Sequence, residues 1–339
     1  MRLFLKQAMA GLMLLLASMP AVRADETKAS FNTYLLKSVD KIYNERKRGG
    51  YSLGAAYSQD LTYGPGLVLA TPNRSADLPQ ARRRTMCVAA MAEIIVEAIN
   101  LYAQETGDDF VYDRLPASTW NRSNLQSLKP YLFMQQDERG VFGYRTGDVP
   151  SARIKNKNDP DKIDTVYALS RGSGHAFSLF GVGVELPFSK LTPGDFINFN
   201  RSKTGHAALF VSYIDKDNRY TTTYSDEVIG FKYFSAQGKG KPDAGFEYRD
   251  AYFGAGRSPT AGAIVADTGV RKSQDRLVLN GGRMWAPPQW EIEKALAAIR
   301  GKISDRSGRP QNTREAYVAQ IFELDMPDSF VDFSDEEEQ

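Results

Sequence analysis

Residues 191–215 read LTPGDFINFNRSKTGHAALFVSYID, and this stretch decides the fold. The turn sequence TPGD leads into one apolar run, and a second apolar run follows after the polar residues RSKTG. Short apolar runs bounded by turn residues are typical of strands. One of only two histidines, His206, stands at the start of the second run. The strands predicted on this basis are residues 195–200, 207–214, 220–224 and 231–236.

Helical patterns dominate the chain before this stretch. The sequence SFNTYLLKSVDKIYNERKRGG predicts an amphipathic helix that starts near Phe31 and ends at Gly49 and Gly50. Further helices are predicted within residues 118–136, in GHAFSLFG, and in the late segments WEIEKALAAIRGKI and NTREAYVAQIFEL. Helices first and strands later are typical of an α+β fold rather than of alternating βαβ units.

The strongest helix prediction is RRRTMCVAAMAEIIVEAINLYAQETG, with Thr85 as its cap and Gly107 at its end. The segment is apolar nearly all round from Met86 to Tyr102, which predicts a mostly buried helix. The exception is a polar stripe of Glu93, Glu97, Asn100 and Gln104.

The N-terminus has the pattern of a secretory signal peptide. Arg2 and Lys6 precede an apolar run, and the small residues Val22 and Ala24 occupy the −3 and −1 positions of a cleavage site. The run is too short to span a bilayer comfortably. Cleavage after residue 24 removes three of the 43 bases and no acid, leaving 40 bases against 41 acids. We therefore expect an exported protein without a stable membrane anchor or a strong field for nucleic acid.

The predicted domain organisation has four parts. Residues 1–24 are the signal peptide, and residues 25–80 hold the N-terminal helix and a loop. Residues 81–257 form the expected catalytic domain, within which residues 140–172 read as a loop. Residues 258–339 are expected to be a helical extension that packs on this domain and closes with the acidic tail SDEEEQ.

Cys87 is the only cysteine, so no internal disulfide can form. A single thiol in an exported protein is either buried and inert or kept for chemistry. The first turn of a helix favours a thiolate, as do the upstream bases Arg82, Arg83 and Arg84. Free N–H groups at the same helix start suit a developing oxyanion. The alternative is that Cys87 is a small core residue.

His206 is the candidate base for this thiol, because a histidine at a sheet end can take the thiol proton and return it to a leaving amine. His175, on the predicted helix start in GSGHAFSLFG, is the competing histidine. A third polar group should orient the imidazole. Gln237 is our preferred candidate, with these alternatives: Ser235, Asp226 and Glu227. Two histidines and one cysteine are too few for an obvious zinc site, so we expect no metal and no cofactor.

The order of these pieces resembles the NlpC-type, papain-like cysteine peptidases of bacterial cell envelopes. The matching segments are the cysteine helix start at residues 85–89, the L-x-P-G-D-F turn at residues 191–199, and G-H-A with its strand at residues 205–213. The resemblance covers roughly residues 80–255. It implies a papain-like core, with the cysteine at the N-terminus of a buried helix on a small antiparallel sheet. It also implies a Cys–His–polar triad that cleaves amide bonds in peptidoglycan peptides without a metal.

The chain departs from this family's pattern at the cysteine. The family often shows an aspartate before the cysteine and a serine after it, where this chain has Met86 and Val88. An upstream tyrosine often assists the oxyanion in the family, and the nearby candidates are Tyr57 and Tyr63.

We therefore expect a periplasmic or extracellular α+β cysteine hydrolase with helical N- and C-terminal extensions. Cys87 attacks the carbonyl of a peptidoglycan peptide or another amide substrate, His206 moves the proton, and Gln237 orients the imidazole. One alternative is an acyltransferase or toxin-type effector that uses the same triad. Another is a non-catalytic envelope binding or scaffold protein, in which Cys87 is a core residue and His206 is structural.

Overall fold

The structure is a computed structural model. It describes residues 28–47, 49–51, 61–65, 67–70, 85–115, 151–155, 163–167, 172–200, 205–238, 244–254, 267–274, 276, 278–295 and 297. Its helices are α1 (Asn32–Arg46), α2 (Cys87–Thr106), α3 (Val111–Arg114) and α4 (Ser173–Leu179), with short 3₁₀ turns η3 (Phe188–Lys190) and η4 (Pro287–Gln289). Its strands are β1 (Leu61–Tyr63), β2 (Leu67–Ala70), β3 (Ser151–Lys155), β4 (Ile163–Tyr167), β5 (Gly183–Leu186), β6 (Phe196–Asn200), β7 (Gly205–Ile214), β8 (Tyr220–Thr221), β9 (Gly230–Gln237), β10 (Gly245–Phe253), β11 (Asp267–Val270) and β12 (Leu279–Met284).

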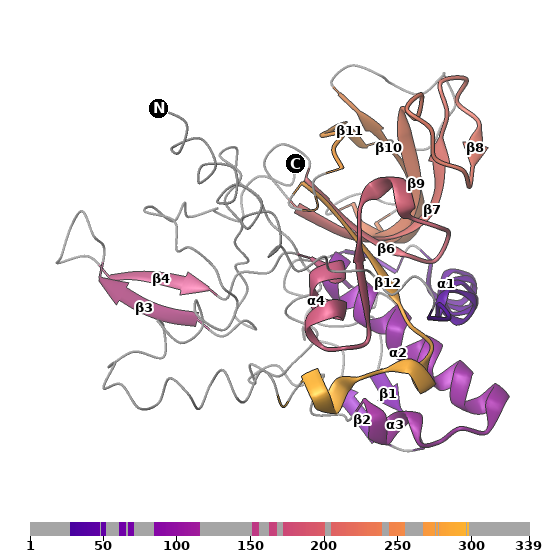
Figure 1. The fold of residues 1–339 in the computed structure, drawn as a ribbon, viewed down its shortest axis with the longest axis vertical. Coiled ribbons are helices and arrows are strands. Elements are labelled where there is room, and N and C mark those ends of the chain that lie inside the picture. Colours follow the sequence, from indigo (N-terminus) through magenta and orange to yellow (C-terminus); the bar gives the residue numbers. More distant parts are fainter. Residues whose placement is uncertain are drawn as a thin grey trace, which may run out of the picture.

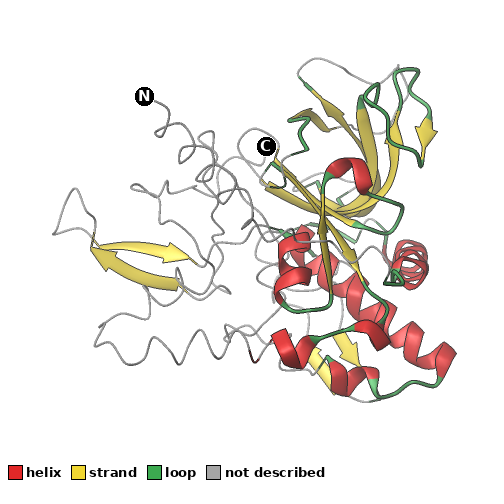
Figure 2. Cartoon of the chain, in the orientation of Figure 1, coloured by secondary structure: helices red, strands yellow, loops and turns green. Residues whose placement is uncertain are grey.

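The main sheet has the strand order β11-β10-β9-β7-β6-β12-β5, with β8 paired to β7 (Figure 1). Neighbouring strands are antiparallel except for β10 and β11, which run parallel. The sheet curls, and α1, α2 and α4 gather against one of its faces (Figures 1 and 2). The prediction of an α+β fold with an antiparallel sheet is therefore confirmed.

The two faces of the sheet carry different cores. On β7, Ala207 and Leu209 belong to the cluster that holds α1, α2 and α4, which we call the helix face. Their neighbours Ala208 and Phe210 belong to a second cluster, which we call the aromatic face. Successive side chains of a strand point to opposite sides, so this division follows from the pleat. The rings that mark the aromatic face are Phe188, Phe199, Phe210, Tyr213, Phe231 and Tyr233.

Helix α2 is the core helix that its composition predicts. Gly107 ends it in the left-handed conformation at φ 72°, a backbone that glycine adopts without a steric penalty. By length and composition α2 could cross a membrane, but 78% of its most apolar window is buried inside the fold. The prediction of Thr85 as the cap is wrong by one position, because the N-cap is Met86.

The two glutamates of the polar stripe on α2 face α1. The buried Glu93 accepts hydrogen bonds from Arg46 Nη1 at 3.2 Å and from Thr85 Oγ1 at 3.1 Å. Glu97 pairs with Lys41. These contacts explain why Thr85 is not the cap, since its hydroxyl is engaged by a carboxylate two turns into the helix. A buried carboxylate needs such partners.

Some of the other predicted helices and strands are present in the structure, and others are replaced by different elements. The N-terminal helix, the short helix in GHAFSLFG and the four predicted strands are present as α1, α4 and β6 to β9, although β8 holds only two residues. The segment 140–172, predicted to be a loop, contains the hairpin β3–β4. Residues 267–270 and 279–284, expected in a helical extension, are strands of the main sheet. The predicted signal peptide and the helices predicted at residues 118–136 and 312–324 lie outside the described residues.

Candidate active site

A ladder of backbone hydrogen bonds places the start of α2 at one end of the sheet. The N–H of Thr85 donates to Gly50 O at 3.2 Å, and the N–H of Gly50 donates to Ala244 O at 2.9 Å. The residue after Ala244, Gly245, pairs with Gln237 at the end of β9. Strand β7 runs antiparallel to β9, so it begins at this same end. The sequence-predicted residues Cys87, His206 and Gln237 therefore come from three elements that meet at one end of the sheet.

Cys87 is the first residue of α2, as predicted, and only 3% of its surface is exposed. It belongs to the helix-face cluster. The N–H of Ala90 donates to Met86 O at 2.8 Å and begins the intrahelical bonds. The amides that precede Ala90 in this turn lie ahead of the helical ladder, as they do at every helix start. These are the amides to which the predicted oxyanion role belongs.

His206 lies at the start of β7, but its side chain lies on the aromatic face. Its ring centroid is 5.4 Å from the ring of Phe199 and 5.6 Å from that of Tyr233. The residue is 1% exposed. Because the adjacent Ala207 belongs to the helix-face cluster, the alternation of the strand turns His206 away from α2. The structure therefore brings Cys87 and His206 to the same end of the sheet but onto opposite faces.

Gln237 lies on the aromatic face with His206. Its Oε1 lies 2.6 Å from the hydroxyl of Tyr233, and that hydroxyl also makes a short hydrogen bond to the carboxylate of Asp267 on β11. Continuing the Leu209–Phe234 register toward the sheet end places Gln237 opposite His206. Gln237 and His206 therefore lie on the same face of the sheet, and the orientation of His206 by Gln237 stays a prediction.

Two residues of this network, Tyr233 and Asp267, were not predicted from the sequence. Tyr233 precedes Gln237 by four residues, and side chains an even number of residues apart share a face of a strand. That spacing was a usable signal for Tyr233. Nothing comparable points to Asp267, because it reaches Tyr233 from strand β11, whose pairing with β10 is not apparent in the sequence.

The alternative third residues have other partners. Ser235 is fully buried and donates to Ala207 O at 2.7 Å on the neighbouring strand. Glu227 is exposed and pairs with Lys216 at 2.6 Å, and the adjacent Asp226 is exposed too. Ser235 is thus engaged with backbone, and the two acids lie at the surface. None of the three is seen to orient His206.

The competing histidine, His175, and the tyrosine Tyr63 lie on other elements than His206. His175 is half-buried in the first turn of α4, where its backbone N–H lies 3.4 Å from Asn280 Oδ1. Tyr63 is buried and its hydroxyl donates to Leu115 O, so its proton is already engaged. Tyr57 lies outside the described residues.

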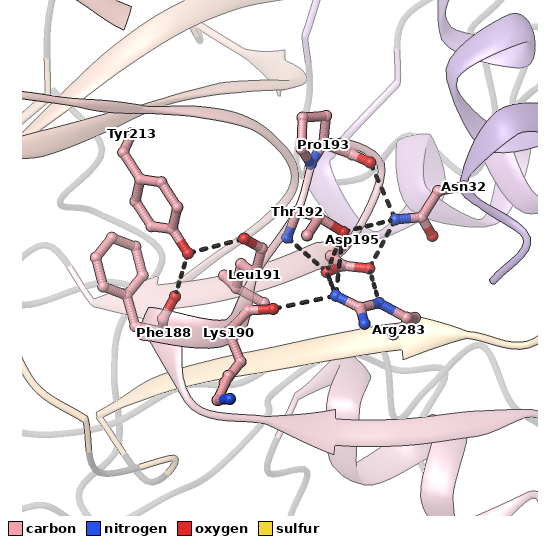
Figure 3. A network of polar contacts seen from close by, with 9 residues as sticks. All are labelled: Asn32, Phe188, Lys190, Leu191, Thr192, Pro193, Asp195, Tyr213 and Arg283. Carbon is pink, nitrogen blue, oxygen red and sulfur yellow. Dashed lines mark hydrogen bonds and ion pairs between the residues drawn. The ribbon is translucent and has the colours of Figure 1, made fainter. Parts of the chain in front are cut away.

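The aspartate of the PGD turn, Asp195, accepts hydrogen bonds from several parts of the fold (Figure 3). Asp195 is fully buried. It accepts hydrogen bonds from the backbone N–H of Thr192 at 2.7 Å, from Asn32 Nδ2 at 2.8 Å and from two nitrogens of Arg283. These donors come from the turn, from α1 and from β12. The PGD motif therefore ties the turn before β6 to two other elements.

Within the described part of the chain, no three His, Cys, Asp or Glu side chains are grouped to hold a metal ion. Comparison with protein-family models, with curated proteins and with solved structures finds no match to this chain.

Proposed function

We propose that the chain is an exported cysteine hydrolase of the NlpC type, which cleaves amide bonds in peptidoglycan peptides. The observation that supports it is the meeting of the start of α2, the start of β7 and the end of β9 at one end of the sheet. Cys87 opens a buried helix there, His206 lies near the start of β7, and Gln237 is the last residue of β9. The resemblance of the cysteine, PGD and GHA segments supplies the reaction class and the substrate.

Each side chain has a defined part in the proposed reaction. The thiolate of Cys87 attacks the amide carbonyl, and N–H groups at the start of α2 stabilise the oxyanion. His206 takes the thiol proton and gives it to the leaving amine, which departs as the acyl-thioester forms. Water then releases the acid. An amine acceptor in place of water turns the same thioester into an acyl-transfer intermediate.

This reaction requires the imidazole within hydrogen-bond reach of the Cys87 sulfur. In the structure Cys87 lies on the helix face and His206 on the aromatic face, so a measurement on the thiol itself is the direct test of the pair. The rate of Cys87 alkylation against pH, in the mature protein and in His206→Ala, gives one. The chain has a single cysteine, so the signal has one source. His175→Ala, which removes the other histidine, is the matched control.

An activated thiol titrates below pH 7, whereas an ordinary one titrates near ~8.5. At pH 6 these values correspond to a thiolate fraction that differs by roughly 30-fold. We expect fast labelling at pH 6 that falls by about this factor in His206→Ala and not in His175→Ala. Digestion of peptidoglycan fragments, with Cys87→Ala as the inactive variant, identifies the bond. Labelling that appears only after denaturation and ignores His206→Ala rules out the hydrolase.

A second candidate is a binding or scaffold protein with the same fold. It is favoured by the burial of both side chains, 3% exposed for Cys87 and 1% for His206, and by their opposite faces. In that case Cys87→Ala leaves binding to isolated peptidoglycan unchanged and the thiol is unreactive. Loss of peptide cleavage in Cys87→Ala, with the fold retained, excludes this candidate.

A further inference from the structure

The hydroxyl of Tyr233 faces two groups that are both placed as acceptors. Gln237 Oε1 lies 2.6 Å from it, and the carboxylate of Asp267 lies on its other side. A tyrosine hydroxyl has one proton to donate, and a carboxylate only accepts. If Tyr233 donates its hydrogen bond to Asp267, it must accept a hydrogen bond from Gln237. Of the two amide atoms of Gln237, only the nitrogen can donate a hydrogen bond. The hydrogen-bond network assigns the orientation of the amide, so Nε2 faces Tyr233.

The burial of Gln237 leads to the same orientation. With Oε1 toward Tyr233, Nε2 lies buried without a hydrogen-bond partner among the described residues, in a side chain that is 3% exposed. A buried donor without a partner is destabilising, because it loses its hydrogen bond to water and gains none in return. Turning the amide gives Nε2 the oxygen of Tyr233 and places Oε1 at the other position. That position then requires a donor, not an acceptor.

His206 is a neighbour on this face that could supply a donor. The Leu209–Phe234 pairing, continued by three residues on each strand, sets Gln237 opposite His206 on the aromatic face. The ring of Tyr233 runs beside the imidazole, with 5.6 Å between centroids, and its hydroxyl reaches Gln237. Side chains directly opposite one another in an antiparallel pair are close neighbours. The Gln237 amide and the His206 ring therefore lie at the same end of the aromatic face, both beside Tyr233.

We infer that Tyr233 and Asp267 are positioning residues, which turn the carbonyl oxygen of Gln237 toward His206 so that it accepts a ring N–H. The bond holds one neutral tautomer and leaves the other ring nitrogen able to take a proton. That state suits a general base. The catalytic meaning of this chain of hydrogen bonds rests on the proposed hydrolase, whereas the orientation itself does not.

The test is the tautomer of His206, read from its two ring-nitrogen chemical shifts in ¹⁵N-labelled protein, with His175→Ala identifying the signals. Wild type is expected to show one tautomer at neutral pH. In Asp267→Ala the hydroxyl of Tyr233 donates to Gln237 Oε1 instead. The amide then turns its Nε2 toward the imidazole, and we expect the opposite tautomer of His206. In Tyr233→Phe the amide is released and averaged shifts are expected.

Tyr213→Phe is the matched control, because Tyr213 is a buried tyrosine of the same face whose hydroxyl lies 2.7 Å from Phe188 O and 2.8 Å from Leu191 O instead. It should leave the His206 tautomer as in wild type. Asp267 is only partly buried on an end strand, so Asp267→Ala tests the inference even if Tyr233→Phe does not fold. An unchanged tautomer in Asp267→Ala overturns the inference.

The same variants separate this inference from the proposed function. A tautomer that reverses in Asp267→Ala, together with Cys87 labelling that ignores His206→Ala, supports the orientation and overturns the hydrolase. Labelling that depends on His206, together with a tautomer that ignores both Tyr233 and Asp267, supports the hydrolase and overturns the orientation.

Discussion

Arg283 on β12 holds the buried carboxylate of Asp195 with two hydrogen bonds, from Nε to Oδ1 at 2.9 Å and from Nη2 to Oδ2 at 2.7 Å (Figure 3). The two residues are 88 positions apart in the chain. Asn32, at the start of α1, adds a third donor to the same carboxylate. One charged group therefore joins the first described helix, the turn before β6 and the last strand of the sheet.

Replacing Arg283 with methionine leaves the Asp195 carboxylate buried without its positive partner. Removing one partner of a buried ion pair typically costs about 3–5 kcal/mol, so we expect a loss of that size in the free energy of unfolding, measured with urea. Arg219→Met is the control. Its side chain is 72% exposed and pairs with Asp215 and Asp217, so it should cost under about 1 kcal/mol. Equal losses in the two variants would show that the Asp195 network adds no stability.

A chain that ends at Arg257 should not fold. It lacks β12, which lies between β5 and β6, and with it Arg283. Strand β5 would then lose its sheet neighbour, and the buried Asp195 would lose its counter-charge. Circular dichroism and amide proton dispersion are the measurements. A cooperative unfolding transition like that of the longer chain would contradict the integration of β12 into the core.

The limits of prediction from sequence are physical, and β12 illustrates them. Its sequence LNGGRM has none of the apolar or β-branched run that marks β6 and β7. The contacts that make it a strand are all distant: Arg283 meets Asp195, and Gly282 lies against Gly174 of α4. Helix α2, by contrast, was predictable because its composition and its terminal glycine act locally.

The face occupied by His206 could not be predicted for a related reason. Both faces of the sheet are covered by a core, so β7 is apolar on both sides and its sequence GHAALFV shows no alternation. With Ala207 and Ala208 equivalent in size, nothing in the run tells which neighbour shares a face with the histidine. Register against β6 decides it, by pairing His206 with Phe199.

Gly174→Ala sets helix propensity against packing. Alanine is favoured over glycine within a helix by about 1 kcal/mol. A Cβ at this position, however, would lie 1.9 Å from Gly281 O, a backbone atom that cannot turn aside. Overpacking typically costs about 1–3 kcal/mol and here meets rigid backbone, so we expect net destabilisation in urea unfolding. Ser178→Ala, on the exposed side of α4, should stay within about 0.5 kcal/mol of wild type. A higher free energy of unfolding in Gly174→Ala would mean that α4 does not pack closely against β12.

Tyr248 should make stability fall at alkaline pH. Burial, followed by the nearby Asp40 carboxylate, raises the pKa of its hydroxyl to about 12. A free tyrosine titrates near 10, so the unfolded chain releases this proton at a lower pH than the folded protein. The resulting stabilisation is complete below about pH 10 and is lost as the pH rises toward 12.

Phenylalanine at position 248 removes the titrating group and keeps the ring contact with Tyr43, whose centroid is 5.0 Å away. Urea unfolding at about pH 9 and about pH 11.5 should therefore show a smaller loss of stability in Tyr248→Phe than in wild type. The other tyrosines titrate in both proteins and cancel in the comparison. Equal losses would place the folded pKa of Tyr248 near its ordinary value and contradict the burial of its hydroxyl beside Asp40.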